Sequence, residues 1–126
     1  MDEVLSEALE PVCRDLERSG LQVPRLEDRE WNDFPGYSSA VMWAPDGSGR
    51  GVSVDRTAPA HERVAAAADQ VQEQTIESQL WGVAETNWPR CPEHSHSHPL
   101  EATTSGEAAV WVCPASRSVI APIGGL

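Results

Sequence analysis

The spacing of two cysteines and two histidines restricts how the last third of the chain can fold. The four side chains are Cys91, His94, His98 and Cys113. Two residues separate Cys91 from His94, the spacing at which a tight backbone turn presents two ligands to one tetrahedral ion. Three residues separate His94 from His98, and fourteen more precede Cys113. A β-hairpin inside that longer gap would return the chain to the first turn, so the spacing predicts a β-meander folded around one metal ion.

Zinc is the metal that this set of side chains suits best. Imidazole and thiolate are both good ligands for Zn²⁺, and the filled d shell of the ion imposes little geometric preference. Two thiolates also cancel the charge of the ion, which makes burial of the assembly less costly. The alternatives are free thiols, a disulfide between Cys91 and Cys113, and a histidine cluster at the surface. We therefore expect Zn²⁺ held by two cysteines and two histidines.

His96 competes with His98 for the place of third ligand. In an extended segment alternate side chains point the same way, so His94, His96 and His98 would share one side of the chain. His98 is favoured because it is followed by Pro99 and by a strand predicted to begin at Leu100. The strand should fix the direction of the His98 side chain, and His96 stays open as the alternative.

The residues around these ligands resemble a pattern found in small uncharacterised actinobacterial proteins with a zinc-ribbon-like C-terminal module. The matching runs are Trp88-Pro89-Arg90-Cys91-Pro92, His94, His98-Pro99-Leu100 and Trp111-Val112-Cys113-Pro114. They cover about the last third of the chain. The resemblance implies a zinc module with the same four ligands, and it implies no particular activity.

Two segments carry the periodicity of amphipathic helices. In residues 2–19 apolar side chains recur three or four positions apart, and Gly20 supplies a stop signal. Residues 58–81 show the same pattern around a run of alanines, and Gly82 ends it. Pro11 removes one backbone donor from the first helix, so a kink or a break is expected near it.

The segments between and after the helices alternate strand-forming residues with turns. Residues 37–44 and 52–54 flank the turn sequence Pro-Asp-Gly-Ser-Gly, which predicts a β-hairpin. Residues 21–31 can add a third strand, which Pro24 would confine to the edge of the sheet. A C-terminal meander is predicted from three further segments, residues 100–103, 108–113 and 119–123. Together with the helices, these strands predict an α+β fold.

The length of 126 residues suits one domain with one hydrophobic core. With 40% apolar and 23% charged side chains, the composition is that of a globular protein, and ten prolines indicate a large share of loop. We expect a single domain over residues 1–126. Within it, residues 1–87 would form a helix, hairpin and helix core, and residues 88–126 would form the zinc-binding subdomain.

The chain is strongly acidic. Its nine basic side chains are all arginine, against twenty Asp and Glu residues, which gives a net charge of -11. Affinity for nucleic acid depends largely on Lys and Arg that neutralise phosphates, so DNA, RNA and anionic membranes are poor partners. Many of the acids fall within the first thirty residues. We interpret them as a solvated helix face followed by loop, with a docking surface for a basic partner as the alternative.

The cytoplasm is the expected location. The chain begins Met-Asp-Glu with no basic region or apolar run, so neither a secretory signal nor a membrane anchor is expected. An odd number of cysteines, three, argues against a disulfide framework and fits a compartment where thiols stay reduced. Cys13 lies beside the apolar stripe of the first helix and is expected to be a small buried hydrophobe.

Tryptophans flank the ligand segment on both sides. Trp81, Trp88 and Trp111 are expected to cover the metal and to join its module to the second helix. The alternative is an exposed aromatic and proline surface that grips a peptide, with Arg90 as a neighbouring cation. We therefore expect a non-enzymatic interaction or adaptor module with structural zinc and a protein or peptide partner.

Two other functions are alternatives. A zinc hydrolase or deaminase would use Glu93 as general acid and base, although the Pro-Cys-x-x-Cys element of the zinc deaminases does not occur in the sequence. An immunity-type protein would use its negative charge to neutralise a basic partner. The biological process and the oligomeric state are left open.

The charge makes a direct prediction about DNA. At physiological salt the protein should show no measurable affinity for generic duplex DNA, because its surplus of carboxylates opposes counterion release. Fluorescence anisotropy with a labelled duplex measures this. A micromolar, salt-sensitive complex would contradict the charge argument and would require a concealed arginine-rich face.

Overall fold

The computed structural model describes residues 2–29, 35–80, 87–94 and 97–126. Within them the chain forms, in order, α1 (Glu3–Arg18), β1 (Arg25–Glu27), β2 (Tyr37–Trp43), β3 (Gly49–Asp55), α2 (Ala60–Thr75), the π-helical turn η1 (Ile76–Leu80), β4 (Glu101–Ser105), β5 (Ala108–Val112) and β6 (Val119–Pro122). The strands form two antiparallel three-stranded sheets, β1-β2-β3 and β4-β5-β6. The predicted α+β fold is confirmed. No helix in these segments is both long enough and apolar enough to cross a membrane.

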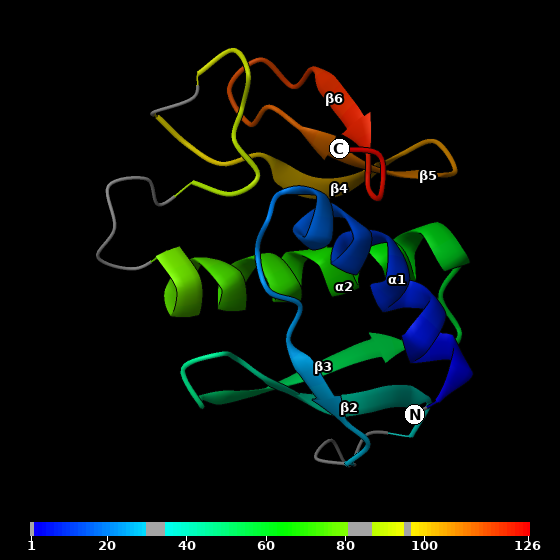
Figure 1. Ribbon diagram of the computed structural model, residues 1–126. Coiled ribbons are helices and arrows are strands. Elements are labelled where there is room, and N and C mark those ends of the chain that lie inside the picture. Colours follow the sequence, from blue (N-terminus) through cyan, green and yellow to red (C-terminus); the bar gives the residue numbers. More distant parts are fainter. Residues whose placement is uncertain (1, 30–34, 81–86, 95–96) are drawn as a thin grey trace.

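The two helices form a layer between the two sheets (Figure 1). α2 contacts α1, β3, β4 and β5, so it must bury side chains on opposite sides. Its small residues Ala65, Ala67 and Ala68 are buried, while Ala66 is exposed. The alanine run therefore allows neighbouring elements to approach the helix closely, as the sequence predicted.

Both sheets and both helices contribute to one cluster of buried apolar side chains. Its largest fully buried members are Leu5, Leu9, Val12 and Leu16 of α1, Met42 of β2, Val52 and Val54 of β3, Val71 of α2, and Leu100 and Trp111 of the C-terminal part. The C-terminal sheet is thus packed into the same apolar interior as the rest of the described chain.

The first helix is continuous through its proline. α1 ends where Gly20, with a φ of 76°, follows the C-cap residue Ser19, as predicted. Of the kink or break expected near Pro11, the break does not occur, because α1 runs as one helix from Glu3 to Arg18. Burial of Leu9 and Val12 on either side contributes about 1.5–3 kcal/mol each. This offsets the roughly 3 kcal/mol that an interior proline costs a helix.

The predicted hairpin is present as β2 and β3. Its turn is closed by the Gly47 amide, which donates to the Ala44 carbonyl at 3.0 Å. Gly49 pairs with Trp43 and lies against its indole, where a Cβ would stand 2.7 Å from the ring. The close approach therefore requires a glycine. β1 is the predicted edge strand and pairs antiparallel with β2.

Three glutamines of α2 connect the helix to both sheets. Gln70 and Gln74 are one turn apart and share a side, whereas Gln72 lies about 200° away around the helix from each of them. Gln70 accepts a hydrogen bond from the Ser53 amide at 3.0 Å and donates to the Ser53 carbonyl at 2.8 Å, on the edge strand β3. Gln74 donates to the Met42 carbonyl at 3.0 Å. The two side-chain amides thus bind the N-terminal sheet, whereas Gln72 points to the opposite side of α2 and binds the C-terminal part.

The predicted C-terminal meander is present as β4, β5 and β6, with the first turn at Gly106 and Glu107. Trp111 has no exposed surface. In the strand register it lies between Ala102 of β4 and Ala121 of β6. Small neighbours on both strands leave room for the indole to pack into the interior.

The carboxylate of Asp15 is buried, which corrects the interpretation of the N-terminal acids as a solvated face. Its Oδ2 accepts hydrogen bonds from Trp111 Nε1 at 2.8 Å and from the Gly124 amide at 2.7 Å. Its Oδ1 accepts one from the Leu126 amide at 3.0 Å. These three N–H donors replace water around the carboxylate. Asp15 therefore joins α1 to β5 and to the residues that follow β6, whereas the glutamates of α1 are exposed as expected.

Replacing Asp15 with asparagine should lower the free energy of unfolding by about 3 kcal/mol, because a neutral amide cannot accept all three hydrogen bonds as strongly. Glu7→Gln, on the exposed face of the same helix, should change it by less than about 0.5 kcal/mol. Denaturant titrations followed by circular dichroism measure both variants. Equal unfolding free energies for the wild type and Asp15→Asn would contradict the assigned role.

Candidate metal centre

The segment that leads from α2 to β4 contains a loop whose two ends are paired. Arg90 and Pro99 form an isolated antiparallel bridge. The Leu100 amide donates a hydrogen bond to the Pro89 carbonyl at 2.8 Å. Residues 90–99 therefore form a loop that is closed at its base, and we call it the ligand loop because it contains the first three candidate ligands.

The four predicted ligands converge. Cys91 and His94 form the expected tight turn, and Cys113 follows β5. One ligand atom from each of Cys91, His94, His98 and Cys113 lies within 4.8 Å of the others. His94 Nδ1 is 3.7 Å from Cys91 Sγ and 3.5 Å from Cys113 Sγ. Sulfur and nitrogen ligands of one tetrahedral zinc ion are about 3.6 Å apart, so these distances fit a single ion.

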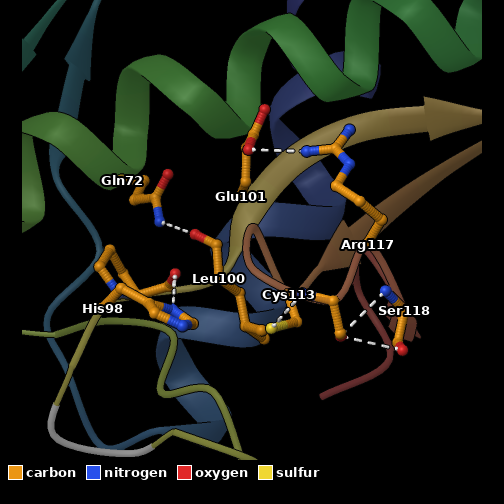
Figure 2. Close-up of polar contacts among 9 residues, drawn as sticks. Gln72, His98, Leu100, Glu101, Cys113, Arg117 and Ser118 are labelled. Carbon is orange, nitrogen blue, oxygen red and sulfur yellow. Dashed lines mark hydrogen bonds and ion pairs between the residues drawn. The ribbon is translucent and has the colours of Figure 1, made fainter.

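One ring nitrogen of His98 is held by a hydrogen bond, and the other is left free to bind a metal ion. Its Nδ1 lies 3.2 Å from the Pro99 carbonyl, which can only accept, so Nδ1 is the donor (Figure 2). Nε2 is then the atom with a free lone pair; it is buried and has no hydrogen-bond partner among the described residues. A buried polar atom without a partner is costly, and a bound metal ion would supply that partner. His98 is thus brought into the cluster as expected, while His96 lies outside the described residues.

The turn after Cys113 repeats the Cys-Pro-x-x pattern of the first turn. The Ser116 amide donates to Cys113 Sγ at 3.4 Å. Hydrogen bonds from the Ser116 side chain and amide lower the pKa of the Cys113 thiol from 9.0 to about 6. This favours the thiolate, the form that binds metal. Ser116 was not among the predicted site residues, although its position in the second Cys-Pro-x-x turn, which corresponds to that of His94 in the first, could have identified it.

Two tryptophans connect the ligand loop to α1. The rings of Trp88 and Trp111 meet edge to face, with centroids 5.8 Å apart at 73°. Trp88 Nε1 donates to Ser19 Oγ at 2.9 Å, and Trp111 Nε1 donates to Asp15. The expected connection to the second helix is therefore incomplete, because both indole N–H groups bond to the first helix. Trp81 lies outside the described residues.

Gln72 supplies the connection to α2. Its Nε2 donates to the Trp88 carbonyl at 3.0 Å and to the Leu100 carbonyl at 2.6 Å, the latter drawn in Figure 2. Trp88 and Leu100 flank the ligand loop, so one buried side chain holds both of its ends. The sequence contains no signal for this role, because glutamine in a helix is usually exposed.

The other candidate side chains lie at the rim of the site or away from it. Glu93 is exposed, and its Oε1 accepts a hydrogen bond from Ser116 Oγ at 3.1 Å. Cys13 of α1 is partly buried; burial and then the neighbouring Glu17 raise the pKa of its thiol to about 11. The raised pKa favours the neutral thiol, and Cys13 is only partly buried where a buried hydrophobe was predicted.

No known protein-family model, curated protein sequence or solved structure matches the chain. The resemblance noted in the sequence is supported only as a Cys/His cluster beside a C-terminal three-stranded antiparallel sheet, and no family is identified. The four residues of this cluster can hold a metal ion.

Purified protein should contain about one metal ion per chain, and either Cys91→Ser or Cys113→Ser should abolish binding, because each removes a thiolate from the only set of ligands assembled in the described residues. His98→Ala should reduce binding more than His96→Ala. Elemental analysis of protein exchanged into metal-free buffer measures the content. Cys13→Ser is the matched control and should keep the metal. Full retention of metal by both ligand-cysteine variants would exclude this site.

Proposed function

We propose that the protein binds one Zn²⁺ ion through Cys91, His94, His98 and Cys113, and that this ion is structural. The observation that carries the proposal is the convergence of two sulfurs and two imidazole rings, one of which presents a buried Nε2 without a hydrogen-bond partner. A Cys₂His₂ set suits zinc in charge, in ligand type and in the distances observed. The ion would cross-link the ligand loop to the turn after β5.

A structural role is supported by the number of ligands and by the burial of the two cysteines, while His94 is exposed. Four protein ligands complete a tetrahedral shell and leave no position for a reacting water. Cys91 and Cys113 have no exposed surface and belong to the same buried cluster as Leu100 and Trp111. Glu93, which the hydrolase or deaminase alternative needs, instead connects the two Cys-Pro turns through Ser116.

We attribute the biological role to an interaction or adaptor module that binds a protein or peptide partner. The support is the net charge of -11 together with the engagement of arginines by acids of the same chain. Ion pairs join Arg14 to Glu10, Arg56 to Asp2, and Arg117 to Glu101. The remaining surplus of carboxylates favours a basic partner. Thiolate ligands also require reducing conditions, which favours the cytoplasm as the location.

Removal of zinc should perturb the C-terminal part more than the helices. Zn²⁺ can contribute an apparent ~10–16 kcal/mol to small metal-folded modules. Trp88 precedes the ligand loop, and Trp111 lies in β5, two residues before Cys113. We therefore expect a chelator to shift tryptophan fluorescence strongly while helical circular dichroism falls much less. The helices keep their contacts with the N-terminal sheet.

Zinc re-addition serves as the control and should restore the native fluorescence spectrum. Metal content must be verified in the same samples. If verified metal-free protein keeps both its native tryptophan spectrum and its melting temperature, the ion is not structural. If the bound metal is not zinc, the assignment of the ion is wrong.

A further inference from the structure

A groove of about 320 Å³ lies beside the metal centre, between α2 and the start of β4. Its apolar lining comes from Ile76, the first residue of η1, and from Pro99, Leu100 and Pro114. Pockets that bind ligands begin at roughly 300 Å³. The groove is therefore large enough to receive an anchoring side chain from another molecule.

The same groove is lined by three carboxylates, Asp69 and Glu73 of α2 and Glu101 of β4. Figure 2 shows Arg117 reaching Glu101, at 3.3 Å. Arg50 lies 3.7 Å from Glu73 but has a closer contact with Glu77. Neither the last turn of α2 nor η1 contains a basic residue. The described lining thus combines an apolar surface with three carboxylates and includes no lysine or arginine, although arginines from outside the lining lie near Glu101 and Glu73.

Two residues connect the groove to the metal centre. His98 lines the groove and is a candidate ligand, and Pro114 lines it directly after the candidate ligand Cys113. Gln72 also lines the groove and donates to the Leu100 carbonyl. A bound ion would fix the positions of His98 and of the turn after Cys113, and with them one wall of the groove.

We propose that this groove binds a segment of a partner protein in which an arginine or lysine stands beside an apolar side chain, and that it does so when the metal centre is loaded. The apolar side chain packs against Ile76 and Pro99, and the cation lies against Asp69 and Glu73. Charge complementarity selects this partner over an acidic or neutral one. Only the metal-dependent part rests on the proposed zinc site.

The test uses the full chain and a fluorescein-labelled peptide of alternating arginine and leucine, with anisotropy measured at physiological salt. Asp69→Lys combined with Glu73→Lys should weaken binding at least about tenfold, because the cation loses both carboxylates and meets two like charges. The control combines Glu7→Lys with Glu107→Lys, which changes the net charge equally at exposed positions outside the groove. It should weaken binding less than about threefold, because neither position lines the groove and the effect of net charge at a distance is screened by salt.

Two further arms test the apolar surface and the metal. A peptide of alternating arginine and serine should bind at least about tenfold more weakly than the arginine and leucine peptide. Cys113→Ser, with its folding checked by circular dichroism, should also bind at least about tenfold more weakly than the loaded wild type.

Equal weakening by both charge-reversed pairs, or equal binding of both peptides, would overturn the proposal that this groove binds the peptide. Unchanged binding by a folded, metal-free Cys113→Ser would overturn the metal dependence alone. If the purified wild-type protein contains no metal, the zinc proposal is refuted. The charge-reversed pairs would still test whether the groove binds the peptide.

Discussion

The position of the helices between two sheets is the constraint that governs the rest of the structure. A helix covered on both sides cannot keep a simple polar face, so it must bury polar side chains where each has a partner. In α2 the alternation of Gln70, Gln72 and Gln74 achieves this, because residues two apart in a helix face nearly opposite directions. The amides of Gln70 and Gln74 bind the N-terminal sheet, and that of Gln72 binds the ends of the ligand loop. The same helix thereby positions both halves of the fold.

Polar contacts of α1 complete this arrangement on the other side of the ligand loop. Asp15 and Ser19, one turn apart, receive the indole N–H groups of Trp111 and Trp88. The two rings also contact each other, so α1, β5 and the start of the loop meet in one place. The candidate metal centre therefore lies next to a hydrogen-bonded network, and its cysteines share the apolar interior of the fold.

Local patterns in the sequence were sufficient for the elements and for the ligands. Helical periodicity, turn residues and ligand spacing predicted both helices, the hairpin, the meander and the four residues that converge. The burial of Asp15 and Gln72 could not be predicted, because their partners are distant in sequence; the Gly124 amide is 109 residues from Asp15. Pro11 differs, because the local sequence favoured a break there, whereas α1 stays continuous with Leu9 and Val12 buried on either side. The polar contacts that determine how the layers pack could thus not be predicted from the sequence.

The paired ends of the ligand loop determine how metal affinity is linked to folding. Gathering ligands from a flexible chain costs conformational entropy, and this cost rises with the length of chain to be closed. Here the Arg90–Pro99 bridge and the Leu100–Pro89 hydrogen bond close the loop with backbone contacts. The folded chain itself would therefore supply part of that closure. The dissociation constant of a bound ion would therefore depend on the integrity of the whole fold, and an ion that binds only the folded chain would stabilise it in return.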